Sequence, residues 1–202
     1  MGERVWPLNK IAGVARHHLQ EFQKARRCPS KKVHAQRPRW KPPDAGLLKV
    51  NFDGAISDDL RVAGIGVAVR NEHGEVVAAL AEQIPIIYSV FTLETMATRR
   101  VVLFARDIGL HHVVFEGDSK SSIHAISNRL LLHSSCGHII HDILLFSRSF
   151  WSFSFSHVCR QGNALADALA KRARLSSPLL VWMESVPPDL YNCYLSDFSS
   201  FI

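Results

Sequence analysis

The sequence predicts an α/β domain whose mixed sheet has five strands, three antiparallel and then two parallel, flanked by helices. Two observations carry this prediction. Residues 48–84 hold three strand-like segments joined by short turns, which is typical of an antiparallel meander. Residues 90–175 then alternate helical repeats with short apolar segments, as in strands that are connected through helices.

Turn-forming residues separate the three strands of the meander, because Asp, Asn and Gly favour the backbone angles of turns. Asp58 and Asp59 supply the first turn, and residues 71–74 (Asn-Glu-His-Gly) supply the second. The strands are therefore expected at residues 48–56, 62–71 and 76–84.

The first helix is expected at residues 90–108, where apolar side chains recur at helical spacing, and Gly109 suits its C-terminal end. Residues 112–116 form a short apolar segment suited to a buried strand, after which Asp118 and Ser119 can cap a second helix. The remaining elements are a helix at residues 139–150, an alternating strand at residues 152–158 and an amphipathic helix at residues 163–175.

Three parts of the chain are expected. Residues 1–44 combine a helical segment at residues 11–27 with a basic, proline-containing linker. Residues 45–176 form the α/β domain, and residues 177–202 form a short proline-rich tail.

Composition limits the classes of protein to consider. No apolar run approaches the roughly 20 residues of a membrane-spanning helix, and the N-terminus lacks the apolar segment of a secretory signal. The four cysteines include no C-x-x-C pair, so the sequence suggests neither a zinc site nor a disulfide framework. We expect no membrane partner and a reducing intracellular compartment, the nucleus or the cytoplasm.

The formal net charge is +6, and much of the positive excess lies in residues 1–41. A basic balance fits a polyanionic partner such as nucleic acid. A solubilising tail explains the same charge equally well, because basic stretches are common.

Four acidic residues lie where the expected fold can bring them together. Asp53 is inside the first strand, and Asp118 ends a strand that can lie beside it in parallel; Glu94 and Asp167 lie on helices that pack on the sheet. Like charges at close range raise one another's pKa, and bound metal ions relieve that repulsion. Magnesium favours oxygen ligands, and a pair of such ions can support phosphodiester hydrolysis.

Each acid also has an ordinary explanation. Asp53 and Gly54 can form a hairpin turn, although Asp58-Asp59 offer a better one shortly afterwards. Asp118 can be a helix cap, and Glu94 and Asp167 can be solvated residues on helix faces.

Five segments of the chain carry a recognisable pattern: NFDGA (51–55), AGIGVAVR (63–70), ETMA (94–97), EGDS (116–119) and GNALADALA (162–170). In this order and spacing they resemble the type 1 ribonuclease H family, most closely the ribonuclease-H-like domains related to reverse transcriptases of plant retroelements (retrotransposons). The resemblance covers about residues 40–175 and implies a three-layer ribonuclease-H-like fold. It also implies that Asp53, Glu94, Asp118 and Asp167 are catalytic residues that bind two magnesium ions, or manganese ions in their place, with no other cofactor.

The sequence departs from the family's pattern in two places. Many members carry a flexible histidine-containing loop before the last helix, whereas here His157 is followed almost directly by the helix and can be a plain strand residue. The basic helix that some members use as a substrate handle is not evident between Ser127 and Cys136.

Discrimination of RNA from DNA requires contacts to the 2′-hydroxyl group. In the resembling family such contacts come from the region of the first strand and the first helix. Gly54, Ser57, Thr92 and Asn163 are the candidates here, although Ser57, Thr92 and Asn163 can equally be surface or capping residues and Gly54 can mark a bulge in its strand.

The resemblance implies an enzyme, a metal-dependent endonuclease that hydrolyses the RNA strand of RNA–DNA hybrids by a two-metal-ion mechanism and acts as a monomer. Two alternatives stay open. One is a catalytically weak or inactive domesticated retroelement domain that binds nucleic acid, and the other is a DNA-directed nuclease or transferase on the same fold.

Overall fold

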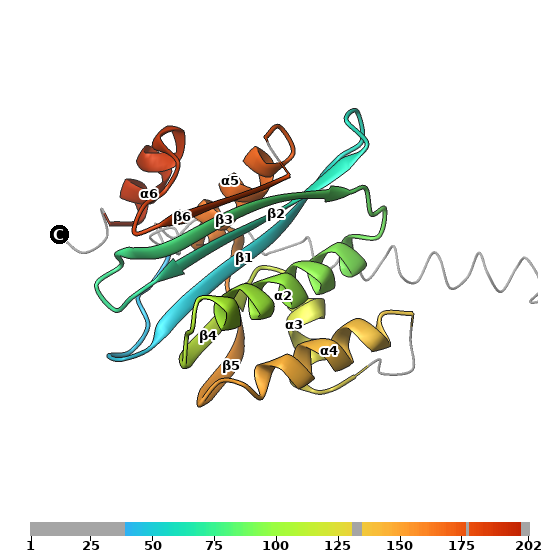
Figure 1. Ribbon diagram of the computed structural model, residues 1–202, viewed down its shortest axis with the longest axis horizontal. Helices are drawn as coiled ribbons and strands as arrows, with labels where there is room; N and C mark the ends of the chain where they lie inside the picture. The colour runs from blue at the N-terminus through green and yellow to red at the C-terminus, as the bar shows by residue number, and fades with distance from the viewer. Residues whose placement is uncertain (1–38, 131–134, 177, 199–202) are drawn as a thin grey trace, which may run out of the picture. The chain divides into compact units, whose positions relative to one another are not determined.

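The computed structural model describes residues 39–130, 135–176 and 178–198, and the helix expected at residues 11–27 lies outside them. Six strands form one sheet in the order β5-β4-β1-β2-β3-β6 (Figure 1). The strands are β1 (Leu48–Ser57), β2 (Val62–Arg70), β3 (Val76–Pro85), β4 (His112–Gly117), β5 (Ser152–His157) and β6 (Leu179–Met183).

The helices are α2 (Val90–Asp107), α3 (Lys120–Ser127), α4 (Gly137–Ser147), α5 (Ala164–Ala173) and α6 (Tyr191–Phe198), with short 3-10 turns η1 (Arg160–Asn163) and η2 (Pro188–Leu190). The pairing of β1, β2 and β3 is antiparallel, and β1, β4 and β5 run parallel. The α/β class, the meander and the two parallel strands are therefore confirmed. Of the described helices, none is long and apolar enough to cross a membrane.

The expected number of strands was too low by one. Residues 179–183, placed by the sequence in a tail, form β6, which pairs antiparallel with β3. This segment holds only five apolar residues between Pro178 and a second proline region, so its pattern alone does not distinguish a strand from a tail. The division of the chain into domains stays a prediction.

The turn between β1 and β2 lies at residues 58–61, where Arg61 N donates to Asp58 O over 3.3 Å. Asp53 and Gly54 are therefore inside β1, paired with Gly66 and Ile65, and the hairpin-turn alternative for them is wrong.

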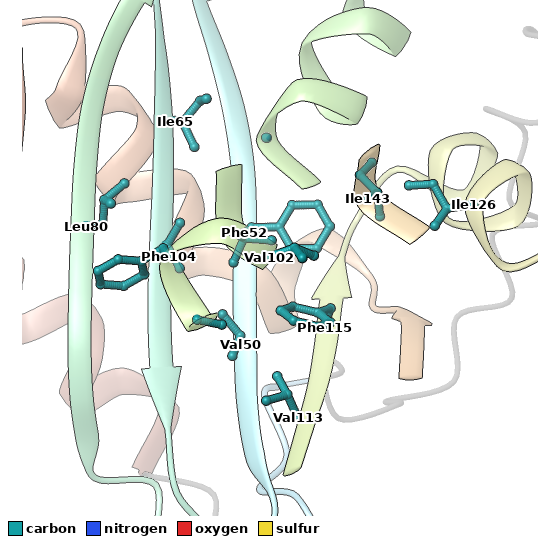
Figure 2. Packing of buried hydrophobic residues seen from close by; sticks show 14 of the residues in the cluster. Val50, Phe52, Ile65, Leu80, Val102, Phe104, Val113, Phe115, Ile126 and Ile143 are labelled. Atoms are coloured by element: carbon teal, nitrogen blue, oxygen red, sulfur yellow. The ribbon is translucent and has the colours of Figure 1, made fainter. Parts of the chain in front are cut away.

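Successive side chains of the central strands point to opposite faces of the sheet, so each face buries its own core. On the first face, α2, α3 and α4 cover a large cluster that includes Val50, Phe52 and Phe115, drawn in Figure 2. On the second face, α5 lies across β1, β2 and β3, and its Leu165 is in the same buried cluster as Ala68 of β2 (Figure 1). The sheet is thus the middle of three layers.

The backbone of α5 approaches β2 closely at Gly64 and Gly66. A Cβ atom built on Gly66 would lie 2.2 Å from Ala166 O, and one on Gly64 would lie 2.1 Å from Ala170 O. Because a backbone oxygen cannot move aside as a flexible side chain can, these glycines allow the helix to pack at this distance. They thereby set the position of Asp167, which lies in the first turn of α5.

Candidate metal centre

Three carboxylates meet at one end of the central strands. Asp53, Glu94 and Asp118 each offer an oxygen, and these oxygens lie within 4.8 Å of one another. Phe52 of β1 is paired in parallel with Gly117 of β4. Asp53 directly follows Phe52, and Asp118 directly follows Gly117. The parallel register of two neighbouring strands therefore places these two acids side by side.

Glu94 reaches the cluster because α2 begins close to β1. Ser89 caps this helix by accepting a hydrogen bond from Thr92 N at 3.2 Å. A Cβ atom built on Gly54 would lie 2.7 Å from Leu93 Cγ, so the glycine leaves room for the first turn of α2. Gly54, a candidate for contact with substrate, is thus required by packing beside Asp53.

Burial and mutual repulsion favour the protonated forms of Asp53 and Glu94. Burial, followed by the charges of Glu94, Asp118 and Asp167, raises the pKa of Asp53 to about 9. Burial and the charge of Asp118 raise the pKa of Glu94 to about 8, although Arg160 and the Gly54 backbone act against the rise. Both side chains are only 5% exposed, so water screens this repulsion poorly.

Glu94 also has a buried oxygen, Oε2, without a hydrogen-bond partner among the described residues. A buried acceptor with no donor is costly unless a bound group supplies one. Three neighbouring carboxylates form an all-oxygen donor set, which is the type that magnesium and manganese prefer. The residues of this site therefore fit a divalent cation.

Asp167 lies beside this cluster and outside the group of three. Its charge and its hydrogen bond contribute to the raised pKa of Asp53, so the two side chains are close. Its Oδ1 accepts from Arg160 at 3.2 Å and its Oδ2 from Lys171 at 2.5 Å. Burial acts to raise the pKa of Asp167, but Lys171 and Arg160 together lower it.

The ordinary explanations for two acids do not hold. The N-cap of α3 is Ser119, which accepts a hydrogen bond from Ser122 N, so the helix does not use Asp118 as its cap. Glu94 is buried and is not a solvated residue of a helix face.

The remaining polar candidates have other contacts. Ser57 is half-buried at the end of β1. Thr92 Oγ1 lies 3.4 Å from Cys136 Sγ, between the starts of α2 and α4. Asn163 is wholly buried and donates to Phe52 O at 2.8 Å, so its side chain does not reach a surface on which substrate could bind.

The link between β5 and α5 is short, as expected. His157 is the exposed final residue of β5, and two residues separate it from η1. Sequence reasoning overlooked Arg160, whose exposed guanidinium pairs with Asp167 and whose charge also acts on Glu94. The available signal was a basic residue in the short segment between β5 and α5, next to the helix that carries Asp167.

Comparison with known proteins covers the part of the chain that holds this site. Residues 51–173 match the model of the family described as "Reverse transcriptase-like", and this range holds all four acids. The chain belongs to the reverse transcriptase-like family. No curated protein matches the chain in sequence at a significant level.

The fold of this reverse transcriptase-like protein is that of type 1 ribonuclease H. The RNase H1 of Halobacterium salinarum NRC-1 aligns with a TM-score of 0.58 at 24% identity, over 63% of this chain and 97% of that one. LC11-RNase H1, solved in complex with an RNA/DNA hybrid, aligns with a TM-score of 0.56 at 20% identity, over 64% and 99%. The N-terminal RNase H domain of a Mycobacterium tuberculosis protein aligns with a TM-score of 0.56 at 21% identity, over 63% and 93%.

Proposed function

We propose that this protein is a metal-dependent endonuclease that hydrolyses the RNA strand of RNA–DNA hybrids. The observation that carries the proposal is the cluster of Asp53, Glu94 and Asp118, in which a buried Glu94 oxygen has no hydrogen-bond partner among the described residues, on a ribonuclease H fold. The hybrid substrate is proposed from the relatives, one of which was solved with an RNA/DNA hybrid.

Asp53, Glu94 and Asp118 would hold two divalent cations, magnesium or manganese, with Asp167 as the additional ligand beside them. Bound there, such cations would activate the attacking water and stabilise the leaving oxygen of the phosphodiester. The family model spans all four acids, which supports a shared role.

The chain's own residues control protons and charge at the site. Without cations, Asp53 and Glu94 hold protons at neutral pH, because their pKa values lie near 9 and 8. Cation binding must release these protons, so it strengthens as the pH rises. Arg160 and Lys171 keep Asp167 ionised and place positive charge where a phosphate backbone would approach.

The decisive experiment is cleavage of a hybrid labelled on its RNA strand, with magnesium or manganese and an EDTA control. Duplex DNA and duplex RNA serve as competing substrates. We expect cation-dependent cleavage of the RNA strand only, and its loss in Asp53→Asn and Asp118→Asn. Equal cleavage of duplex DNA would instead indicate a DNA-directed nuclease.

Two observations favour a second function, nucleic-acid binding with weak or no catalysis. Both oxygens of Asp167 are bonded by cationic side chains, and the segment after His157 has no room for a loop that assists turnover. Hybrid binding without cleavage, at cation concentrations that saturate the site, would establish this alternative.

A further inference from the structure

A buried polar network runs from the C-terminal helix α6 to the strand that carries Asp53. Its centre is Arg70 on β2, whose side chain is 0% exposed. Arg70 Nη1 donates to Asp197 Oδ2 of α6 at 2.6 Å, and its guanidinium lies over the Trp40 ring at 3.8 Å from the centroid. A charge this deeply buried requires a partner, so α6 is bound to the sheet through Asp197.

The network continues from Arg70 to Asn51 on β1. Asn51 Oδ1 accepts from Arg70 Nη2 at 3.2 Å and from Trp40 Nε1 at 2.8 Å. Its Nδ2 donates to Glu116 Oε2 at 3.1 Å and to Asn163 Oδ1 at 3.2 Å. Two donors at the oxygen and two acceptors at the nitrogen leave the Asn51 amide a single orientation.

Asn163 completes the path to the metal centre. Its Nδ2 donates to Phe52 O at 2.8 Å, and Phe52 immediately precedes Asp53. Asn163 also directly precedes α5, whose first turn carries Asp167. The two amides therefore join the strand that presents Asp53 to the helix that presents Asp167.

We propose that α6 is a positioning element of the acidic site, acting through the Asp197–Arg70 ion pair on the Asn51–Asn163 amide pair. Asp197 anchors the guanidinium, the guanidinium orients Asn51, and Asn51 holds Asn163 against the Phe52 carbonyl. None of these residues touches the reacting atoms, so their effect is on the relative position of Asp53 and Asp167. As far as catalysis is concerned, this inference rests on the proposed function.

The first test does not depend on catalysis. In the full chain labelled with 15N-asparagine, the side-chain amides of Asn51 and Asn163 are buried and hydrogen-bonded, so their hydrogens exchange slowly. We expect Asp197→Asn to speed this exchange about tenfold or more, because loss of a hydrogen bond to a charged group makes local opening about that much more frequent. Unchanged exchange would overturn the inference whether or not the protein cleaves RNA.

The second test measures hybrid cleavage. We expect Asp197→Asn to lower kcat about tenfold and to raise the magnesium concentration for half-maximal cleavage, with KM for the hybrid within about twofold. Asp189→Asn is the matched control, because Asp189 pairs with Arg172 at the surface near α6, away from the network. Its kcat should equal that of the unaltered protein; an equal loss in both variants would overturn the inference.

A double variant separates positioning from stability. Arg70→Met with Asp197→Leu replaces the buried ion pair by apolar side chains, which generally preserves folding. We expect its thermal midpoint to match that of the unaltered protein while kcat stays low, because Asn51 has lost its Arg70 donor. Recovery of kcat together with stability would refute a positioning role. If the unaltered protein cleaves no hybrid, the proposed function fails and amide exchange alone decides this inference.

Discussion

Replacing Asp53 by Asn should stabilise the cation-free protein while it abolishes cleavage. The pKa of Asp53 is about 9 in the folded protein, against the ordinary value of 3.8 that applies to the unfolded chain. The folded protein therefore binds this proton more tightly than the unfolded chain. Between these values the stability of the unaltered protein falls as the pH rises, because only the unfolded chain ionises freely. Asn removes the titration and keeps the shape.

The size of the effect follows from that interval. Each pH unit above 3.8 costs up to about 1.4 kcal/mol, which gives an upper limit of roughly 4 kcal/mol at pH 7. Water entry and side-chain movement reduce the cost of a buried charge, so we expect a gain of about 1–3 kcal/mol. For a protein of this size, that gain corresponds to a rise in Tm of roughly 3–10 °C.

The assay is urea unfolding in EDTA between pH 5 and pH 9, with Asp59→Asn as the control, since Asp59 is exposed in the β1–β2 turn. The difference between Asp53→Asn and the unaltered protein should widen with pH, whereas the control should run parallel to the unaltered protein. Added magnesium should stabilise the unaltered protein and have little effect on Asp53→Asn. A variant less stable than the unaltered protein at every pH would refute the reasoning.

Three further outcomes are expected. Gly66→Ala should destabilise the protein by about 3 kcal/mol in urea unfolding, because its Cβ would lie 2.2 Å from Ala166 O; an unchanged midpoint would contradict this packing. Lys171→Met should lower the magnesium concentration for half-maximal cleavage about two- to fivefold, because it frees Asp167 Oδ2 and removes a positive charge beside the site. A rise in this magnesium concentration would count against Asp167 as a ligand. Cleavage at low magnesium should rise between pH 7 and pH 9, since Glu94 and Asp53 must lose protons that burial holds to pKa values of about 8 and 9; a rate independent of pH at subsaturating magnesium would contradict it.

The sequence determined the elements of the fold from local signals. Alternation and turn residues located the meander, and helical spacing with Gly109 located α2, because periodicity and turn chemistry depend on neighbouring residues alone. The same patterns did not locate β6, whose five residues become a strand by pairing with β3. Pairing of this kind is a property of the sheet and leaves little trace in so short a segment.

The four acids could be named from the sequence, and the resemblance singled them out among many acidic residues. Their arrangement could not be read in the same way. The register of β1 against β4 places Asp53 beside Asp118, and the space at Gly54 brings Glu94 to them. Asp167 lies beside Asp53, and Arg160 and Lys171 bind its two oxygens.

The buried network around Arg70 could be found only from the tertiary structure. The network joins residues that are far apart in the sequence: Arg70 and Asp197, which share one hydrogen bond, are 127 positions apart. The residues around them give no local sign that Asn51, Arg70 or Asp197 will be buried. A polar side chain enters the core only when partners from distant elements satisfy its hydrogen bonds and charge. Local sequence thus specified most of the strands and helices. Which charged side chains lie together between these elements depended on how the elements pack.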